Sequence, residues 1–97
     1  MEHDIAVGGT YRHFKGTLYT VIAVAQHSVE ELHQLLVIFM DTVAVSTMMA
    51  GMKPVDGRSW ARPVEEWEEE VDKPDFNYKG KRFVLIDAPA PGTGFFS

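Results

Sequence analysis

The stretch TYRHFKGTLYTVIAVAQ, residues 10–26, decides the fold because it joins a turn signal to the clearest strand pattern of the chain. Its second part, residues 17–26, is rich in β-branched residues and alternates between two sets of side chains that are both largely apolar. That pattern is typical of a strand in the middle of a small barrel or sandwich. The dipeptide Lys15-Gly16 is suited to a tight turn before this strand. The sequence therefore predicts an antiparallel hairpin through Lys15-Gly16.

Further short strands are expected on the C-terminal side of the hairpin. Residues 35–41, LLVIFMD, form a continuous apolar run whose length and β-branching favour a buried strand. Residues 60–62 predict a strand stub and residues 82–86 a closing strand, whereas residues 73–81, KPDFNYKGK, are interpreted as a polar loop.

A helical turn is expected between Pro63 and Trp67. Proline has a fixed backbone angle suited to the first position of such a turn. Glu65 and Glu66 complement the positive end of the turn. The acidic residues that follow are interpreted as an edge strand or a solvated connection.

Residues 42–58, TVAVSTMMAGMKPVDGR, are the ambiguous segment. Their first residues are compatible with an extension of the preceding strand. The methionines are flexible apolar side chains that fill irregular spaces, and the residues of KPVDG are typical of turns. Such a length without assured structure is unusual in a compact domain and is typical of functional or partner-bound loops. We therefore expect a long insertion here.

These elements predict a mainly β domain, because an α/β fold would need crossover helices. We expect a small SH3-like β-barrel with short helical turns. The single domain is expected to span residues 8–87, with the insertion at 42–58. Residues 1–7 are interpreted as an N-terminal extension and residues 88–97 as a C-terminal tail.

Composition excludes several classes of function. The chain has 97 residues and 45% apolar content, which fits one modest core. A formal charge of -5 argues against a protein that coats nucleic acid through bulk positive charge. Six of the fourteen acidic residues lie between Glu65 and Asp72, so the rest of the chain is close to neutral. The absence of cysteine excludes disulfides, thiol nucleophiles and thiolate metal sites.

The sequence is that expected of a soluble, cytoplasmic protein with no membrane partner. The N-terminus lacks the positive start and apolar run of a signal peptide, and no segment approaches the about 20 apolar residues of a membrane span. A chain of this size has a limited core, so self-association as a homodimer is left open as a source of stability.

Three blocks of the sequence resemble a known family. GGTYRHFKGTLYTVIAVAQHS, WARPVEEWEEEV and RFVLI are similar to the small bacterial and phage domain of unknown function 1653. The matching residues are Gly9, Tyr11, Arg12, His13, Phe14, Lys15, Gly16, Tyr19, Val21, His27, Ser28, Trp60, Arg62, Pro63, Trp67, Glu69, Arg82 and Phe83. Gln26 stands where the family pattern has arginine, and residues 42–58 are much longer than the family's turn. The resemblance implies a domain type and no reaction.

Aromatic and cationic side chains are concentrated at a few positions. The candidate ligand-binding residues are Tyr11, Arg12, His13, Phe14, Lys15, His27, Trp60 and Arg62. Rings stack on a base or another planar group, and a guanidinium grips phosphate or carboxylate through paired hydrogen bonds. Side chains from Tyr11 to Phe14 alternate between the two faces of a strand, so one cleft holds only one pair of them. The alternative interpretation makes Tyr11, Phe14 and Trp60 core rings and pairs the arginines with acidic residues 68–70.

Catalysis and metal binding have little support in the sequence. The pair His27-Ser28 is more ordinary as a turn histidine with a capping serine, because a triad is not identifiable from spacing. The histidines and carboxylates near residues 27–41 match no recognised metal-ligand spacing. We expect no catalytic residue, metal or cofactor. An enzyme would need a polar cleft that contains His13 or His27.

The leading hypothesis is a non-enzymatic binding module for a small anionic or nucleotide-like ligand, or a short single-stranded nucleic acid. The alternative is a protein–protein adaptor, including a phage-encoded inhibitor. The adaptor would act through residues 42–58 and the acidic residues 65–72. In this hypothesis the acidic residues imitate a phosphate backbone.

Overall fold

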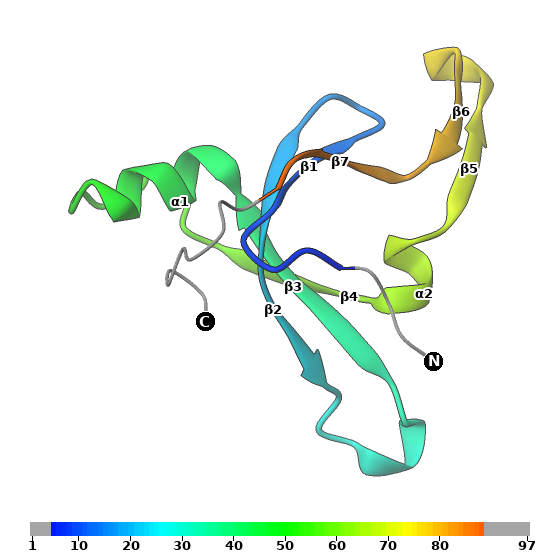
Figure 1. Ribbon diagram of the computed structural model, residues 1–97, viewed down its shortest axis with the longest axis horizontal. Helices are drawn as coiled ribbons and strands as arrows, with labels where there is room; N and C mark the ends of the chain where they lie inside the picture. The colour runs from blue at the N-terminus through cyan, green and yellow to red at the C-terminus, as the bar shows by residue number, and fades with distance from the viewer. Residues whose placement is uncertain (1–4, 89–97) are drawn as a thin grey trace.

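The computed structural model describes residues 5–88 as a mainly β fold (Figure 1). An antiparallel sheet of five strands has the order β4-β3-β2-β1-β7, and β5 and β6 pair separately. The strands are β1 (Thr10–His13), β2 (Leu18–Gln26), β3 (Leu35–Asp41), β4 (Ser59–Pro63), β5 (Glu70–Lys73), β6 (Tyr78–Lys81) and β7 (Phe83–Asp87). The helices are α1 (Thr42–Met49) and α2 (Val64–Trp67), with single 3₁₀ turns η1 (Glu30–Leu32) and η2 (Pro74–Phe76). No helix within residues 5–88 has the length and apolar character needed to cross a membrane.

The hairpin predicted around Lys15-Gly16 is confirmed. Strands β1 and β2 pair antiparallel, with Tyr11 opposite Tyr19. The His13 amide donates to the Thr17 carbonyl at 2.8 Å, and the Gly16 amide donates to the His13 carbonyl at 2.7 Å. Gly16 has φ +100°, a left-handed conformation that glycine adopts without steric cost. A three-residue turn therefore sets the register of the two strands.

The predicted SH3-like barrel is not confirmed, because the sheets do not close. Strands β4 and β7 form the two edges of the larger sheet, and the chain leaves β4 through α2 to build the β5–β6 ribbon (Figure 1). Residues 73–81, expected as a polar loop, instead complete this ribbon. Asn77, at φ 49°, ends η2 in the left-handed conformation that turns the chain into β6.

The first half of residues 42–58, the segment that the sequence left ambiguous, forms α1 and does not extend the preceding strand. The Asp41 carboxylate accepts a hydrogen bond from the Val43 amide at 2.8 Å and caps the helix. Ala44 and Val45 are buried with Met40 of the preceding strand. Asp41 therefore ends a strand, as predicted, and also caps a helix, which was not predicted.

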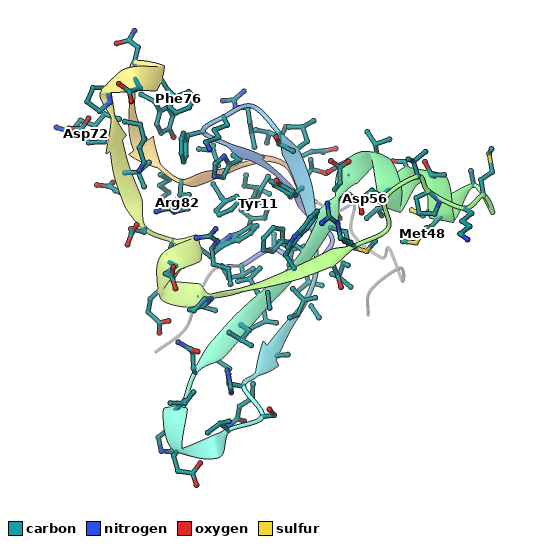
Figure 2. The ribbon with its side chains drawn as sticks, turned by 180° about the vertical axis from the view of Figure 1, so that it is seen from behind. Tyr11, Met48, Asp56, Asp72, Phe76 and Arg82 are labelled. Carbon is teal, nitrogen blue, oxygen red and sulfur yellow. The ribbon has the colours of Figure 1, made fainter. Side chains whose placement is uncertain are left out.

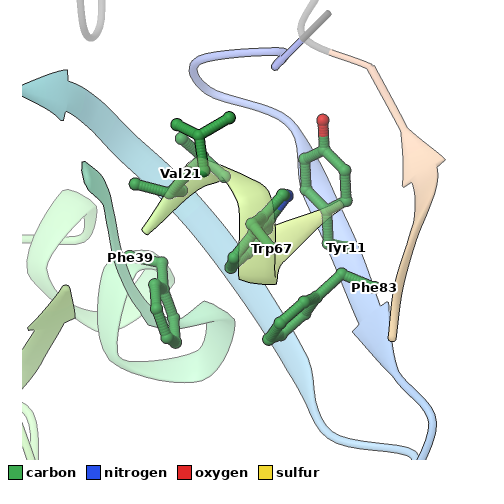
Figure 3. Packing of buried hydrophobic residues seen from close by; sticks show 7 residues of the cluster. Tyr11, Val21, Phe39, Trp67 and Phe83 are labelled. Atoms are coloured by element: carbon green, nitrogen blue, oxygen red, sulfur yellow. The ribbon is translucent and has the colours of Figure 1, made fainter. Parts of the chain in front are cut away.

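The core lies between the larger sheet and α2 (Figure 3). Trp67 is 2% exposed and stacks on Phe83, with ring centroids 3.8 Å apart and planes 7° from parallel. Tyr11 meets the edge of the same indole at 5.1 Å. The predicted helical turn ending at Trp67 is confirmed, and Pro63 is its N-cap. This turn is short, but it carries the largest fully buried side chain.

Residues just before the hairpin also pack on the core. Ile5, Ala6 and Val7 contact the buried cluster, and the Ala6 amide donates to the Tyr11 hydroxyl at 3.0 Å. Residues 1–4 and 89–97, which include most of the predicted extension and tail, lie outside the described residues. The domain boundaries at residues 8 and 87 stay predictions.

Replacing Trp67 should destabilise the fold more than any exposed substitution. Trp67→Ala removes the indole that stacks on Phe83, and loss of a buried tryptophan typically costs about 3–5 kcal/mol. Val43→Ala is the control, since Val43 is 74% exposed; it should change the free energy of unfolding by less than about 0.5 kcal/mol. Urea denaturation followed by circular dichroism measures both. Equal losses in the two variants would contradict this account of the core.

Candidate functional site

An open cleft of about 440 Å³ lies on one face of the larger sheet, between β4 at one edge and the start of β7 at the other. Its walls combine aromatic rings with one ion pair. The lining residues are His13, Tyr19, Phe39, Trp60, Ala61, Arg62, Pro63, Glu66 and Phe83.

Strand register explains why these side chains meet. Directly paired residues of an antiparallel sheet point to the same face. Tyr11 pairs with Tyr19, His13 with Phe83, and Phe39 with Trp60. These six rings therefore share one face of the larger sheet. Helix α2 covers one part of that face as the core, and the part that α2 leaves uncovered is the cleft.

The floor of the cleft is aromatic. Phe39 and Phe83 are nearly buried, whereas Tyr19, Trp60 and His13 are half-buried. The Tyr19 centroid lies 5.1 Å from that of Phe39 and 5.9 Å from that of Trp60. The His13 and Phe83 centroids are 5.1 Å apart. Edge-to-face contacts of this kind hold the rings in fixed orientations.

Arg62 provides the cation at the rim. Its guanidinium carbon lies 5.8 Å from the centroid of Phe83. Its Nη1 is 3.7 Å from Oε1 of Glu66, one helical turn away, which is too long for a strong hydrogen bond. The guanidinium has five N–H donors in a planar fork, so it retains capacity to bind an anion.

The surroundings of His13 disfavour its charged form. Its pKa is lowered from the ordinary histidine value of 6.5, first by burial and then by the charges of Arg82, Lys15 and Arg62. Nδ1 accepts a hydrogen bond from the Lys15 amide at 3.1 Å. The neutral ring therefore carries its proton on Nε2 and is a hydrogen-bond donor at that atom.

The other candidate residues lie elsewhere. Tyr11 is in the core at 5% exposure, and Arg12, which follows it on β1, is exposed and absent from the cleft lining. Phe14 and Lys15 occupy the turn after β1, beside the β5–β6 ribbon. His27 lies beyond the end of β2, where its Nδ1 accepts from the Val29 amide at 3.0 Å.

The structure thus gathers three of the candidates, His13, Trp60 and Arg62, in one cleft. Tyr19, Phe39 and Phe83 also line the cleft and were not among the residues predicted to bind a ligand. Alternation would have placed Tyr19 on the face of Val21, but assigning Phe39 and Phe83 to that face requires the pairing register. Among the side chains that the structure describes, which exclude that of Glu30, no group of three or more histidines and carboxylates is arranged to hold a metal ion.

The sequence matches the model of the family described as "Protein of unknown function (DUF1653)" over residues 9–85. The chain belongs to this family, as its motifs indicated. No curated protein matches the sequence. The crystal structure of a DUF1653 protein from Bordetella bronchiseptica is similar, with a TM-score of 0.61 and 22% identity over 91% of this chain and 95% of that chain. This likeness shows a shared fold. The family description names no enzymatic activity.

Titration of His13 tests the electrostatics of the cleft. NMR should give His13 a pKa below 6.5. The folded state then binds the proton less readily than the unfolded state, so His13 favours unfolding as pH falls below about 6.5 and has no such effect above it. The free energy of unfolding of the wild type, measured relative to that of His13→Gln, should decrease as pH falls below about 6.5. A His13 pKa at or above 6.5 would contradict the burial and the three neighbouring cations.

Proposed function

We propose that this DUF1653 domain is a non-enzymatic binding module whose cleft takes a small, planar, anionic ligand of the nucleotide type. The observation that supports the proposal is an aromatic cleft floor, with Tyr19 and Trp60 half-buried, beside the guanidinium of Arg62. A planar group would lie against Trp60 or Tyr19, and its phosphate or carboxylate would face Arg62.

Stacking and charge would each contribute to binding. A base stacked on an aromatic side chain is worth about 1–3 kcal/mol, and a hydrogen bond to a charged group about 1.5–3 kcal/mol. The long Arg62–Glu66 contact is exposed, and exposed ion pairs are weak. An incoming phosphate can therefore replace the carboxylate at small cost.

The charge of the whole chain does not oppose this proposal. The net charge is -5, but Arg62 lines the cleft, and Lys15 and Arg82 lie close enough to His13 to lower its pKa. Affinity for an anion would therefore be local and sensitive to salt.

Calorimetric titration with AMP tests the proposal. The wild type should give saturable heat, and Arg62→Ala should weaken binding by roughly 10- to 100-fold, as expected for losing a charged hydrogen bond. Trp60→Ala should cause a loss of similar size.

Arg12→Ala is the matched control, because it removes the same charge from a residue outside the cleft. It should leave AMP binding unchanged. No saturable heat with AMP or other nucleotides and small anions, or equal effects of Arg12→Ala and Arg62→Ala, would remove the proposal.

A second candidate function is a protein–protein adaptor, favoured by the surface of α1 and the residues after it. Residues 42–52 carry no charge, yet Val43, Met49 and Met52 are 74%, 60% and 66% exposed. Methionines form contact surfaces that repack readily around a partner. Figure 2 shows Met48 on this helix far from Phe76 on the opposite arm of the molecule. None of residues 42–52 lines the cleft, so the adaptor surface is distinct from it.

The adaptor function predicts a partner that co-purifies with the wild type and with Arg62→Ala. Val43→Lys combined with Met49→Lys should abolish co-purification without changing the circular dichroism spectrum, since both side chains are exposed. These substitutions leave the buried Ala44 and Val45 in place. Retention of the partner by the double variant would exclude α1 as the contact surface.

A further inference from the structure

We infer that the cleft continues into a second aromatic and basic subsite at Phe14, Phe76 and Tyr78, and that the occupant of both is single-stranded nucleic acid. This inference rests on the proposed function and makes it narrower. A mononucleotide would fill the cleft alone, whereas a strand would extend across His13 to the β5–β6 ribbon.

A continuous series of rings connects the two subsites. The Trp60 and Tyr19 centroids are 5.9 Å apart, and Tyr19 is 6.5 Å from His13. The His13 ring lies 4.2 Å from Phe14, and Phe14 lies 5.4 Å from Phe76. Side chains alternate between the two faces of a strand, but β1 ends at His13. The Phe14 ring therefore lies against the His13 ring and does not point to the opposite face. Along this series every ring is half-buried or exposed.

The second subsite is aromatic and accessible. Phe76 is 51% exposed, at the end of η2. The planes of the Tyr78 and Phe14 rings differ by 28°, with centroids 6.0 Å apart, and the Tyr78 hydroxyl donates to the Lys81 carbonyl. Figure 2 shows Phe76 on the arm formed by the smaller sheet. Its exposed ring is not required to fill the core, so it is available to a base.

Two lysines accompany these rings. The ammonium of Lys15 lies 5.9 Å from the Phe14 centroid and 5.7 Å from that of Phe76. The ammonium of Lys73 lies 5.7 Å from the Phe14 centroid. Within residues 5–88 neither lysine has a carboxylate ion-pair partner. Both charges therefore remain available to phosphates.

The acidic residues of strand β5 are placed away from this surface. Glu70 pairs with Lys81 across the two strands, and Asp72 pairs with Lys79. These four side chains are exposed on one face of the ribbon, and Lys73 and Tyr78 lie on the other. The ribbon therefore presents two acidic and two basic side chains on its outer face, and Lys73 and Tyr78 on the face toward Phe14.

Alternating rings and cations suit an unpaired strand. Its bases are free to stack on side chains, and its phosphates follow the positive groups without sequence readout. Bases in a duplex are stacked on each other and cannot reach these rings. A strand of at least about four nucleotides would be needed to occupy both subsites.

The test is fluorescence anisotropy with a labelled oligo-dT of about 12 nucleotides, with dTMP and the matching dA·dT duplex as competitors. The oligonucleotide should bind at least about tenfold more tightly than dTMP or the duplex. Phe76→Ala should weaken oligonucleotide binding by roughly 5- to 100-fold, corresponding to one stacked base, and should leave dTMP binding unchanged.

Lys73→Ala and Lys79→Ala form a matched pair, since they remove the same charge from opposite faces of the ribbon. Only Lys73→Ala should reduce the salt dependence of binding, measured as the slope of log K against log salt concentration, by about one unit. Equal effects of the two variants, or a duplex bound as tightly as the single strand, would overturn the inference. Oligonucleotide affinity equal to that of dTMP would overturn it while the proposed function stands. If neither the oligonucleotide nor dTMP binds, both this inference and the proposed function are wrong.

Discussion

The stacking of Trp67 on Phe83 is the contact on which the rest of the structure depends. It attaches a four-residue helical turn to the face of an open sheet, with ring centroids only 3.8 Å apart. Tyr11 and Phe39 complete the cluster around the indole. Because α2 is so short, it covers only part of the sheet. The position of this one side chain therefore decides which rings form the core and which remain accessible.

The two faces of the larger sheet have different roles. The face opposite the cleft carries Thr20 and Met40, and α1 covers it through Ala44 and Val45. The Thr20 hydroxyl also meets that of Thr42 at 2.9 Å. The other face is rich in aromatic residues and only partly covered. An aromatic side chain is stable in either environment, since its ring packs in a core and also stacks on a planar ligand.

The sequence allowed prediction where a few neighbouring residues determine the structure. The hairpin follows from Lys15-Gly16 and the β-branched run after it, and α2 follows from Pro63. Helix α1 was missed because Asp41 belongs to a strand and also caps a helix. Closure of a barrel depends on whether the two edge strands of the sheet, here β4 and β7, pair with each other. A local sequence pattern does not determine that pairing.

The candidate site was predictable only in part, for the same reason. Residue type and density pointed to His13, Trp60 and Arg62, which the cleft brings together. The same criterion also selected Tyr11, which is in the core, and Arg12, which faces away from the cleft. Type alone does not say which face a side chain occupies or whether another element covers that face. Pairing register and the reach of α2 supply that information.

The most direct test of the account uses the two tryptophans, one half-buried in the cleft and one sealed in the core. Their indole N–H groups give separate NMR signals, which can be followed during titration with AMP. The account predicts a saturable shift of the Trp60 signal and a Trp67 signal that stays in place. A stationary Trp60 signal at saturating AMP, or equal shifts of both signals, would contradict the claim that this cleft is a binding site.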